Sequence, residues 1–92
     1  MTEFDWQLED GRIAHCWQAD RVEYEDAVID TGLVEGIEPD NYYLCIRREG
    51  DEPLMLLLRK DEMMSITWLC NGAIWSGEMM ERGVIGGRDE LG

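Results

Sequence analysis

The stretch of sequence that decides the fold is Phe4-Asp5-Trp6-Gln7-Leu8-Glu9-Asp10-Gly11-Arg12-Ile13. Apolar and polar residues alternate along its first half, which is typical of a strand with one buried face. The Asp10-Gly11 pair is typical of a two-residue turn between antiparallel strands. Counting outward from such a turn pairs Leu8 with Ile13 and Trp6 with His15. The stretch therefore predicts an antiparallel hairpin with an aromatic face.

Further turns and strands extend this hairpin into a sheet. A second tight turn at Ala19-Asp20 would pair Trp17 with Val22 and make residues 21–25 a strand. Residues 30–41 contain two glycines and Pro39, which predicts a loop. Residues 42–48 and 54–59 then form a second hairpin. The later of these two strands is apolar on both faces, which is typical of a central strand.

A long helix is expected after the second hairpin, over residues 61–81. Asp61 is a natural N-cap and Gly83 a natural C-terminal stop. One apolar stripe, which includes Met63, Ile66 and Cys70, is expected to pack on the sheet. A second stripe lies 120–150° away by the helical period of about 3.6 residues, and it consists of Met64, Trp68, Trp75 and Met79.

These elements predict an α+β fold. An antiparallel sheet of about five strands, an N-terminal meander plus a second hairpin, is packed by one long C-terminal helix. The length of 92 residues suits a single small domain over residues 1–92. Its last segment, residues 83–92, is rich in glycine and is expected to be a flexible tail.

The charge of the chain excludes some classes of partner. The chain has 21 acidic and 8 basic residues, a net charge of −13. Direct binding to nucleic acid needs a basic face, and an anionic membrane would repel this chain. Eight acids lie within residues 20–40 against Arg21 alone. Either this density serves only solubility, or it contacts a basic partner protein.

The sequence offers little for catalysis, metals or cofactors. His15 is the only histidine, so a His-rich metal site cannot form. There is no twelve-residue calcium loop, Walker loop or dinucleotide fingerprint. We therefore expect no catalytic residue, no metal and no cofactor. The acidic N-terminus is unlike a signal peptide, and three widely spaced cysteines favour a reducing cytoplasm.

The segment Ala27-Val28-Ile29-Asp30-Thr31-Gly32 resembles the active-site strand and loop of retroviral-type aspartic proteases. The resemblance implies a homodimer in which each subunit gives one catalytic Asp, here Asp30, to a shared dyad. Leu33-Val34 departs from the small residue that follows the motif in that family. The predicted helix also occupies a region where that family has strands. We therefore expect a turn at Asp30-Thr31-Gly32 and keep the protease as an alternative.

The function predicted from these observations is that of a small acidic, non-enzymatic protein-binding module. It would resemble nucleic acid in charge and occupy a basic groove of a nucleic-acid-handling protein, as phage-encoded inhibitors of similar size and charge do. A second alternative is a structural or assembly subunit that uses the Trp and Met stripe of the helix, for which a second copy of this chain is one candidate partner. The candidate binding residues are Glu23, Glu25, Asp26, Asp30, Glu35, Glu38, Met64, Trp68, Trp75 and Met79.

Overall fold

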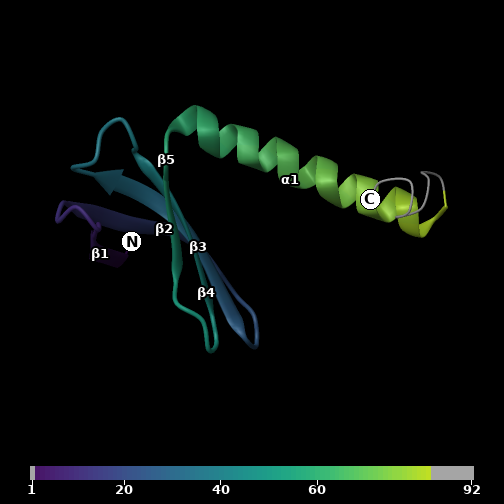
Figure 1. Cartoon of the computed structure of the whole chain (residues 1–92), viewed down its shortest axis with the longest axis horizontal. Helices are drawn as coiled ribbons and strands as arrows, with labels where there is room; N and C mark the ends of the chain where they lie inside the picture. The colour runs from purple at the N-terminus through teal and green to yellow at the C-terminus, as the bar shows by residue number, and fades with distance from the viewer. Residues whose placement is uncertain (1, 84–92) are drawn as a thin grey trace. The chain divides into compact units, whose positions relative to one another are not determined.

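The computed structural model describes residues 2–83, in which five strands precede one helix (Figure 1). The strands form one antiparallel sheet in the order β1-β2-β3-β4-β5. The predicted α+β class, with five antiparallel strands and one C-terminal helix, is confirmed. The chain divides into two compact units, Met1–Lys60 and Asp61–Gly92, so the single domain stays a prediction. The elements are β1 Thr2–Gln7, β2 Ile13–Glu23, β3 Ala27–Glu35, β4 Tyr42–Arg48, β5 Leu54–Leu58 and α1 Lys60–Glu81.

The first hairpin forms, but its register differs from the predicted one by one residue. Its loop has three residues, 9–11, because the Leu8 N–H donates to the Arg12 carbonyl at 2.8 Å and Gly11 takes a φ of 89°. Glycine in the left-handed conformation at the third position is typical of such loops. Trp6 therefore pairs with Ala14 rather than with His15. Because side chains alternate, this slip moves His15 to the face opposite Trp6.

The predicted turn at Ala19-Asp20 is wrong, because β2 runs straight through it. The register shifts between Gln18 and Asp20, which marks a β-bulge at Ala19. A bulge adds one residue to a strand without ending it. The hairpin instead turns at Glu25-Asp26, where the Tyr24 N–H donates to the Ala27 carbonyl at 2.7 Å.

The predicted loop over residues 30–41 is also wrong in its first half, because β3 continues to Glu35. Gly32 does not turn the chain. It is buried, and a Cβ there would lie 1.9 Å from the Trp17 carbonyl oxygen and 2.7 Å from Cε1 of Tyr43. A glycine inside a strand commonly marks such a close approach beside a bulge.

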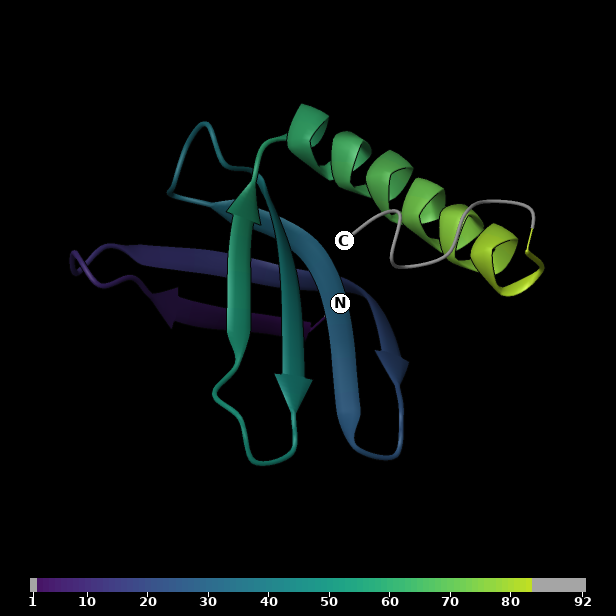
Figure 2. The same ribbon diagram turned by 45° about the vertical axis from the view of Figure 1, so that its right-hand side comes forward.

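The core lies on one face of the sheet, which bends so strongly that β1 crosses the direction of β4 and β5 (Figure 2). Phe4 from β1 packs edge-on against Tyr43 from β4, with ring centroids 5.4 Å apart. The predicted central position of the last strand is wrong, because β5 is an edge strand. Its apolar residues Met55 and Leu57 face the core, which contains the buried residues Ala14, Cys16, Val34, Ile37, Tyr43 and Cys45.

Helix α1 begins one residue before the predicted start and ends at Glu81 as predicted. Gly83 takes a φ of 75°, and its N–H donates to the Met80 carbonyl at 3.0 Å, a common way to end a helix. No residue of α1 is buried, and its packing on the sheet stays a prediction. The described part of the chain contains no helix with the length and hydropathy needed to span a membrane. Most of the predicted tail lies outside the described residues.

Candidate functional site

The structure separates the predicted acidic residues into two groups at opposite ends of β3. Glu23, Glu25 and Asp26 lie where β2 turns into β3. Glu35 ends β3 and Glu38 follows it in the next loop. Eight residue steps of about 3.3 Å make β3 up to about 26 Å long, and this strand separates the two groups. The predicted single acidic surface over residues 20–40 is therefore two surfaces.

One acidic residue that the sequence did not indicate joins the first group. The N–H of Glu49, in the turn between β4 and β5, donates to the Asp26 carbonyl at 2.9 Å. This bond joins two turns that are more than 20 residues apart in the sequence. No local pattern could have predicted it. We call Glu23, Glu25, Asp26 and Glu49 the turn cluster.

The turn cluster is exposed, and few of its negative charges are paired with a positive side chain of the described residues. All four side chains are exposed. Within residues 2–83, Glu23 alone of the four has an ion pair, with Arg21 at 2.7 Å. Exposed acids with few counter-charges create a field that attracts basic proteins and speeds their association.

Asp30 is not part of either surface. It is 1% exposed. Tyr43 donates its hydroxyl proton to Oδ2 at 2.7 Å, and Arg47 forms an ion pair with Oδ1. Burial, followed by this hydrogen bond to Asp30, raises the pKa of Tyr43 well above its usual value. Both carboxylate oxygens thus have partners, as a buried charge requires.

The position of Asp30 bears on the aspartic protease alternative. In that family the paired Asp side chains lie at the active site of a dimer and share a proton. Here Asp30-Thr31-Gly32 lies inside β3, and Arg47 compensates the carboxylate within the same chain. This geometry favours a structural role for Asp30.

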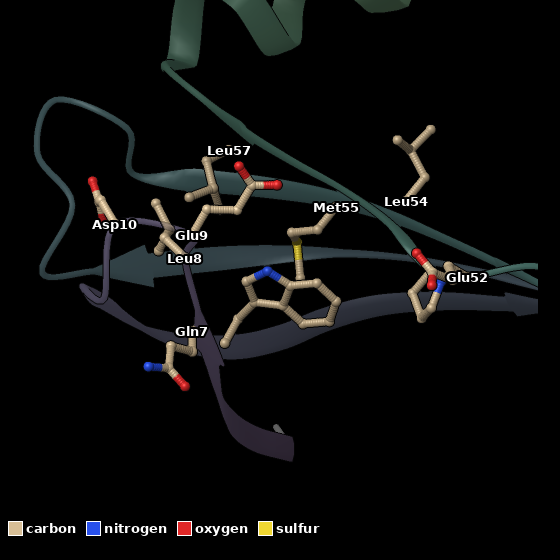
Figure 3. A pocket seen from close by; sticks show the side chains of 10 residues that line it. Gln7, Leu8, Glu9, Asp10, Glu52, Leu54, Met55 and Leu57 are labelled. Carbon is tan, nitrogen blue, oxygen red and sulfur yellow. The ribbon is translucent and has the colours of Figure 1, made fainter.

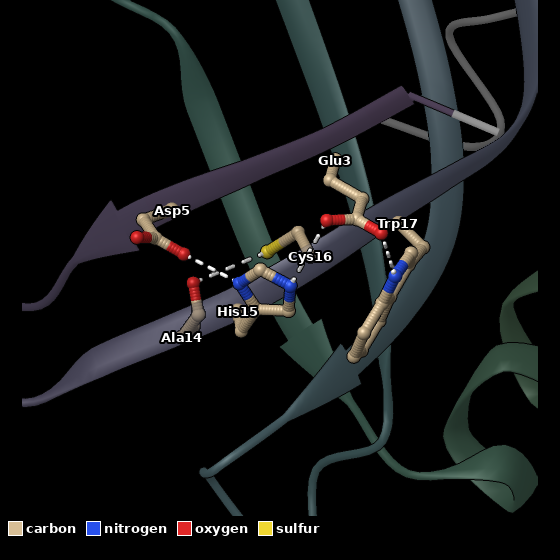
Figure 4. Close-up of polar contacts among 6 residues, drawn as sticks. All are labelled: Glu3, Asp5, Ala14, His15, Cys16 and Trp17. Carbon is tan, nitrogen blue, oxygen red and sulfur yellow. Dashed lines mark hydrogen bonds and ion pairs between the residues drawn. The ribbon is translucent and has the colours of Figure 1, made fainter.

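A polar cluster around His15 lies on the face of the sheet opposite the core (Figure 4). Nδ1 of His15 lies 2.6 Å from Oδ1 of Asp5, and Nε2 lies 3.6 Å from a Glu3 oxygen. Trp17 donates its indole proton to Glu3 at 3.0 Å and packs edge-on against the imidazole, with centroids 4.4 Å apart. The hydrogen bond to Asp5 raises the pKa of His15. The predicted register hid this cluster, because it placed Asp5 and His15 on opposite faces.

Cys16 and Cys45 are buried, which disfavours the reactive thiolate form. Burial raises the pKa of Cys16 to about 11 and also raises the pKa of Cys45. Thiols with such pKa values stay protonated and react slowly. Cys70, by contrast, is exposed on α1. Within residues 2–83, no group of three or more His, Cys, Asp or Glu side chains could hold a metal ion.

An open groove of about 690 Å³ runs between the end of β1 and β5 (Figure 3). Its apolar lining comes from Trp6, Leu8, Met55 and Leu57, all partly exposed. The exposed carboxylates of Glu9, after β1, and Glu52, before β5, also line it. Sequence reasoning did not find this groove, because it depends on how the sheet bends.

The second predicted stripe of the helix, which consists of Met64, Trp68, Trp75 and Met79, is largely exposed. Met64 is 58% exposed, Trp68 77% and Trp75 57%, while Met79 is half-buried. Residues 63–77 carry no charged side chain. The spacing of the four residues places them on one side of α1. Aromatic residues and methionine are enriched at protein interfaces.

Comparison with known proteins does not assign the chain to a family. No protein-family model, no curated protein and no solved structure matches the chain. Its function must therefore be argued from its own residues.

Proposed function

We propose that this protein is a non-enzymatic binding module whose turn cluster contacts a basic surface of another protein. The observation that carries the proposal is the juxtaposition of two turns, which gathers Glu23, Glu25, Asp26 and Glu49 at one end of the sheet. Because three of the four have no ion pair within the described chain, their charge is available to a partner. Such complementarity increases association rates and selects partners of opposite charge.

The partner that fits best is a nucleic-acid-handling protein. Proteins of that class carry grooves lined with Lys and Arg that contact successive phosphates. The turn cluster offers several carboxylates to such a groove, while the net charge of −13 makes nucleic acid itself an unfavourable partner. Occupying the groove would inhibit the partner by excluding its nucleic acid.

A capture experiment from host lysate tests this proposal. The immobilised protein is expected to retain a basic, nucleic-acid-binding protein at 0.1 M salt and to lose it at 1 M, because the screening length falls from about 10 Å to about 3 Å. Added nucleic acid should release the captured protein. Capture that survives both high salt and nucleic acid would contradict the proposal.

A second candidate function is assembly through α1. It is favoured by the exposure of Trp68 and Trp75 on a helix whose residues 63–77 are uncharged. Buried aromatic side chains contribute much of the binding energy in protein interfaces. This stripe could contact a second copy of the chain or the same partner.

A further inference from the structure

The groove between β1 and β5 combines two features that together define an occupant. Its lining mixes apolar side chains, among them the aromatic ring of Trp6, with polar ones. Carboxylates of Glu9 and Glu52 line separate ends of it, with Met55 between them in Figure 3. An apolar surface with an aromatic ring and carboxylates suits the aliphatic stem and charged head of lysine or arginine.

The carboxylates of Glu9 and Glu52 are available to such a side chain. Neither has an ion pair within the described residues 2–83. Asp10 also borders the groove, but its carboxylate already has hydrogen-bond partners. It accepts hydrogen bonds from the backbone and side chain of Arg12, which lower its pKa. An incoming basic segment would therefore meet one available carboxylate at each end of the groove.

The strands beside the groove also favour an extended segment. Among the described residues 2–83, β1 pairs with β2 alone and β5 with β4 alone, so within this part of the chain each has one edge without a strand partner. Free edges carry backbone N–H and C=O groups that can pair with an added strand. From Glu52 to Leu57 the groove side of the chain is about 17 Å long at about 3.3 Å per residue. That length matches a segment of about five residues.

We infer that this groove binds an extended basic segment of the partner protein, with lysine or arginine side chains at Glu9 and at Glu52 and an aliphatic stem beside Trp6. The inference rests on the proposed function in taking the partner to be a basic protein. It adds a second contact, in which an apolar surface and a strand edge supplement the charge of the turn cluster.

The test uses a synthetic peptide of about six residues that alternates valine and lysine, titrated into the whole protein and followed by NMR. Its matched control replaces each lysine with glutamine. The lysine peptide is expected to shift the indole N–H signal of Trp6 and the backbone amides of residues 54–57. The glutamine peptide should bind about tenfold more weakly or not at all. Equal binding of both peptides, or no binding of the lysine peptide, would overturn the inference.

Two charge-neutralising variants locate the binding site. Glu9→Gln/Glu52→Gln is expected to raise the Kd for the lysine peptide about tenfold, while Glu35→Gln/Glu38→Gln, which removes the same charge outside both the groove and the turn cluster, leaves it nearly unchanged. All four side chains are exposed, so both variants should fold. Equal weakening by both variants, or weakening by the second alone, would overturn the groove as the binding site.

A small cation distinguishes a peptide site from a site for free organic cations. Tetramethylammonium offers the charge without a backbone. We expect it to cause no saturable shift of the amides of residues 54–57. Saturable binding with the same shifts as the peptide would overturn the peptide and indicate a small-cation site. Capture of a basic protein from lysate tests the proposed function separately, so the two can fail independently.

Discussion

At the scale of single residues, Asp30 shows how burial changes the role of an acid. The sequence places it among eight acids within 21 residues, and so among the candidate binding residues. In the structure it is buried, and the chain supplies Tyr43 and Arg47 as partners from the neighbouring strand. These pairings depend on strand register, which sequence alone could not give here.

The Asp30 cluster should contribute to stability rather than to binding. Replacing Tyr43 with Phe removes a hydrogen bond to a charged group and is expected to lower the free energy of unfolding by about 2 kcal/mol. Asp30→Asn should lower it by at least as much, because Arg47 loses its ion-pair partner. Urea denaturation measures both changes. Glu38→Gln, an exposed acid in the next loop, is the control, with a change within about 0.5 kcal/mol.

His15 should give the sheet a pH-dependent contribution to stability. Its pKa is raised above the usual 6.5, chiefly by the hydrogen bond to Asp5. A group with a raised pKa in the folded state stabilises fully below pH 6.5, and this stabilisation is lost as the pH rises through the raised value. NMR titration should show a raised pKa for His15 that falls in Asp5→Asn. An unchanged His15 pKa in that variant would contradict the assignment.

At the scale of the elements, the sequence predicted which segments form strands and helix better than it predicted how the strands pair. The hairpin over residues 42–58 and the helix were predicted within a residue or two. The first register slipped because a three-residue loop around Gly11 and a two-residue turn use the same residues. The sequence at the Ala19 bulge is similar to that of a turn. Gly32 was predicted to lie in a loop, whereas β3 requires glycine there because the Trp17 carbonyl oxygen leaves no room for a side chain.

Because backbone atoms approach Gly32 closely, we expect this position to tolerate no residue larger than glycine. Gly32→Ala would place a methyl group 1.9 Å from a backbone oxygen, so the sheet must shift, and overpacking of this kind costs about 1–3 kcal/mol or more. Gly77→Ala meets nothing within 4 Å on α1 and should stabilise the helix by about 1 kcal/mol. Circular dichroism during thermal unfolding measures both. Full tolerance of alanine at Gly32 would disprove the bulge geometry.

Because the stripe of α1 is exposed, we expect its residues to contribute to association and not to the stability of the fold. Trp68→Ala/Trp75→Ala should change the free energy of unfolding by less than about 1 kcal/mol, because both side chains are exposed. The same variant should lose self-association in analytical ultracentrifugation, or partner binding, if the helix is an interface. Simple unfolding of the variant would show instead that the stripe packs within the chain.

At the scale of the whole molecule, composition gave the sign of the charge, and the sequence showed its concentration in residues 20–40. It could not predict that β3 divides the acids between two ends of the sheet, or that Glu49 joins one of them. That distribution follows from pairing between distant segments. The groove between β1 and β5 could not be predicted for the same reason, since it requires the bend of the complete sheet.

The central claim is that the turn cluster, rather than total charge, binds the basic partner. Two variants that each remove four negative charges test it: Glu23→Gln/Glu25→Gln/Asp26→Asn/Glu49→Gln, and Glu35→Gln/Glu38→Gln/Glu78→Gln/Glu81→Gln. Isothermal titration calorimetry with the captured partner at 0.1 M salt gives the Kd of each. The account predicts that the first variant binds at least about tenfold more weakly than the second. Equal affinities of the two variants would contradict it.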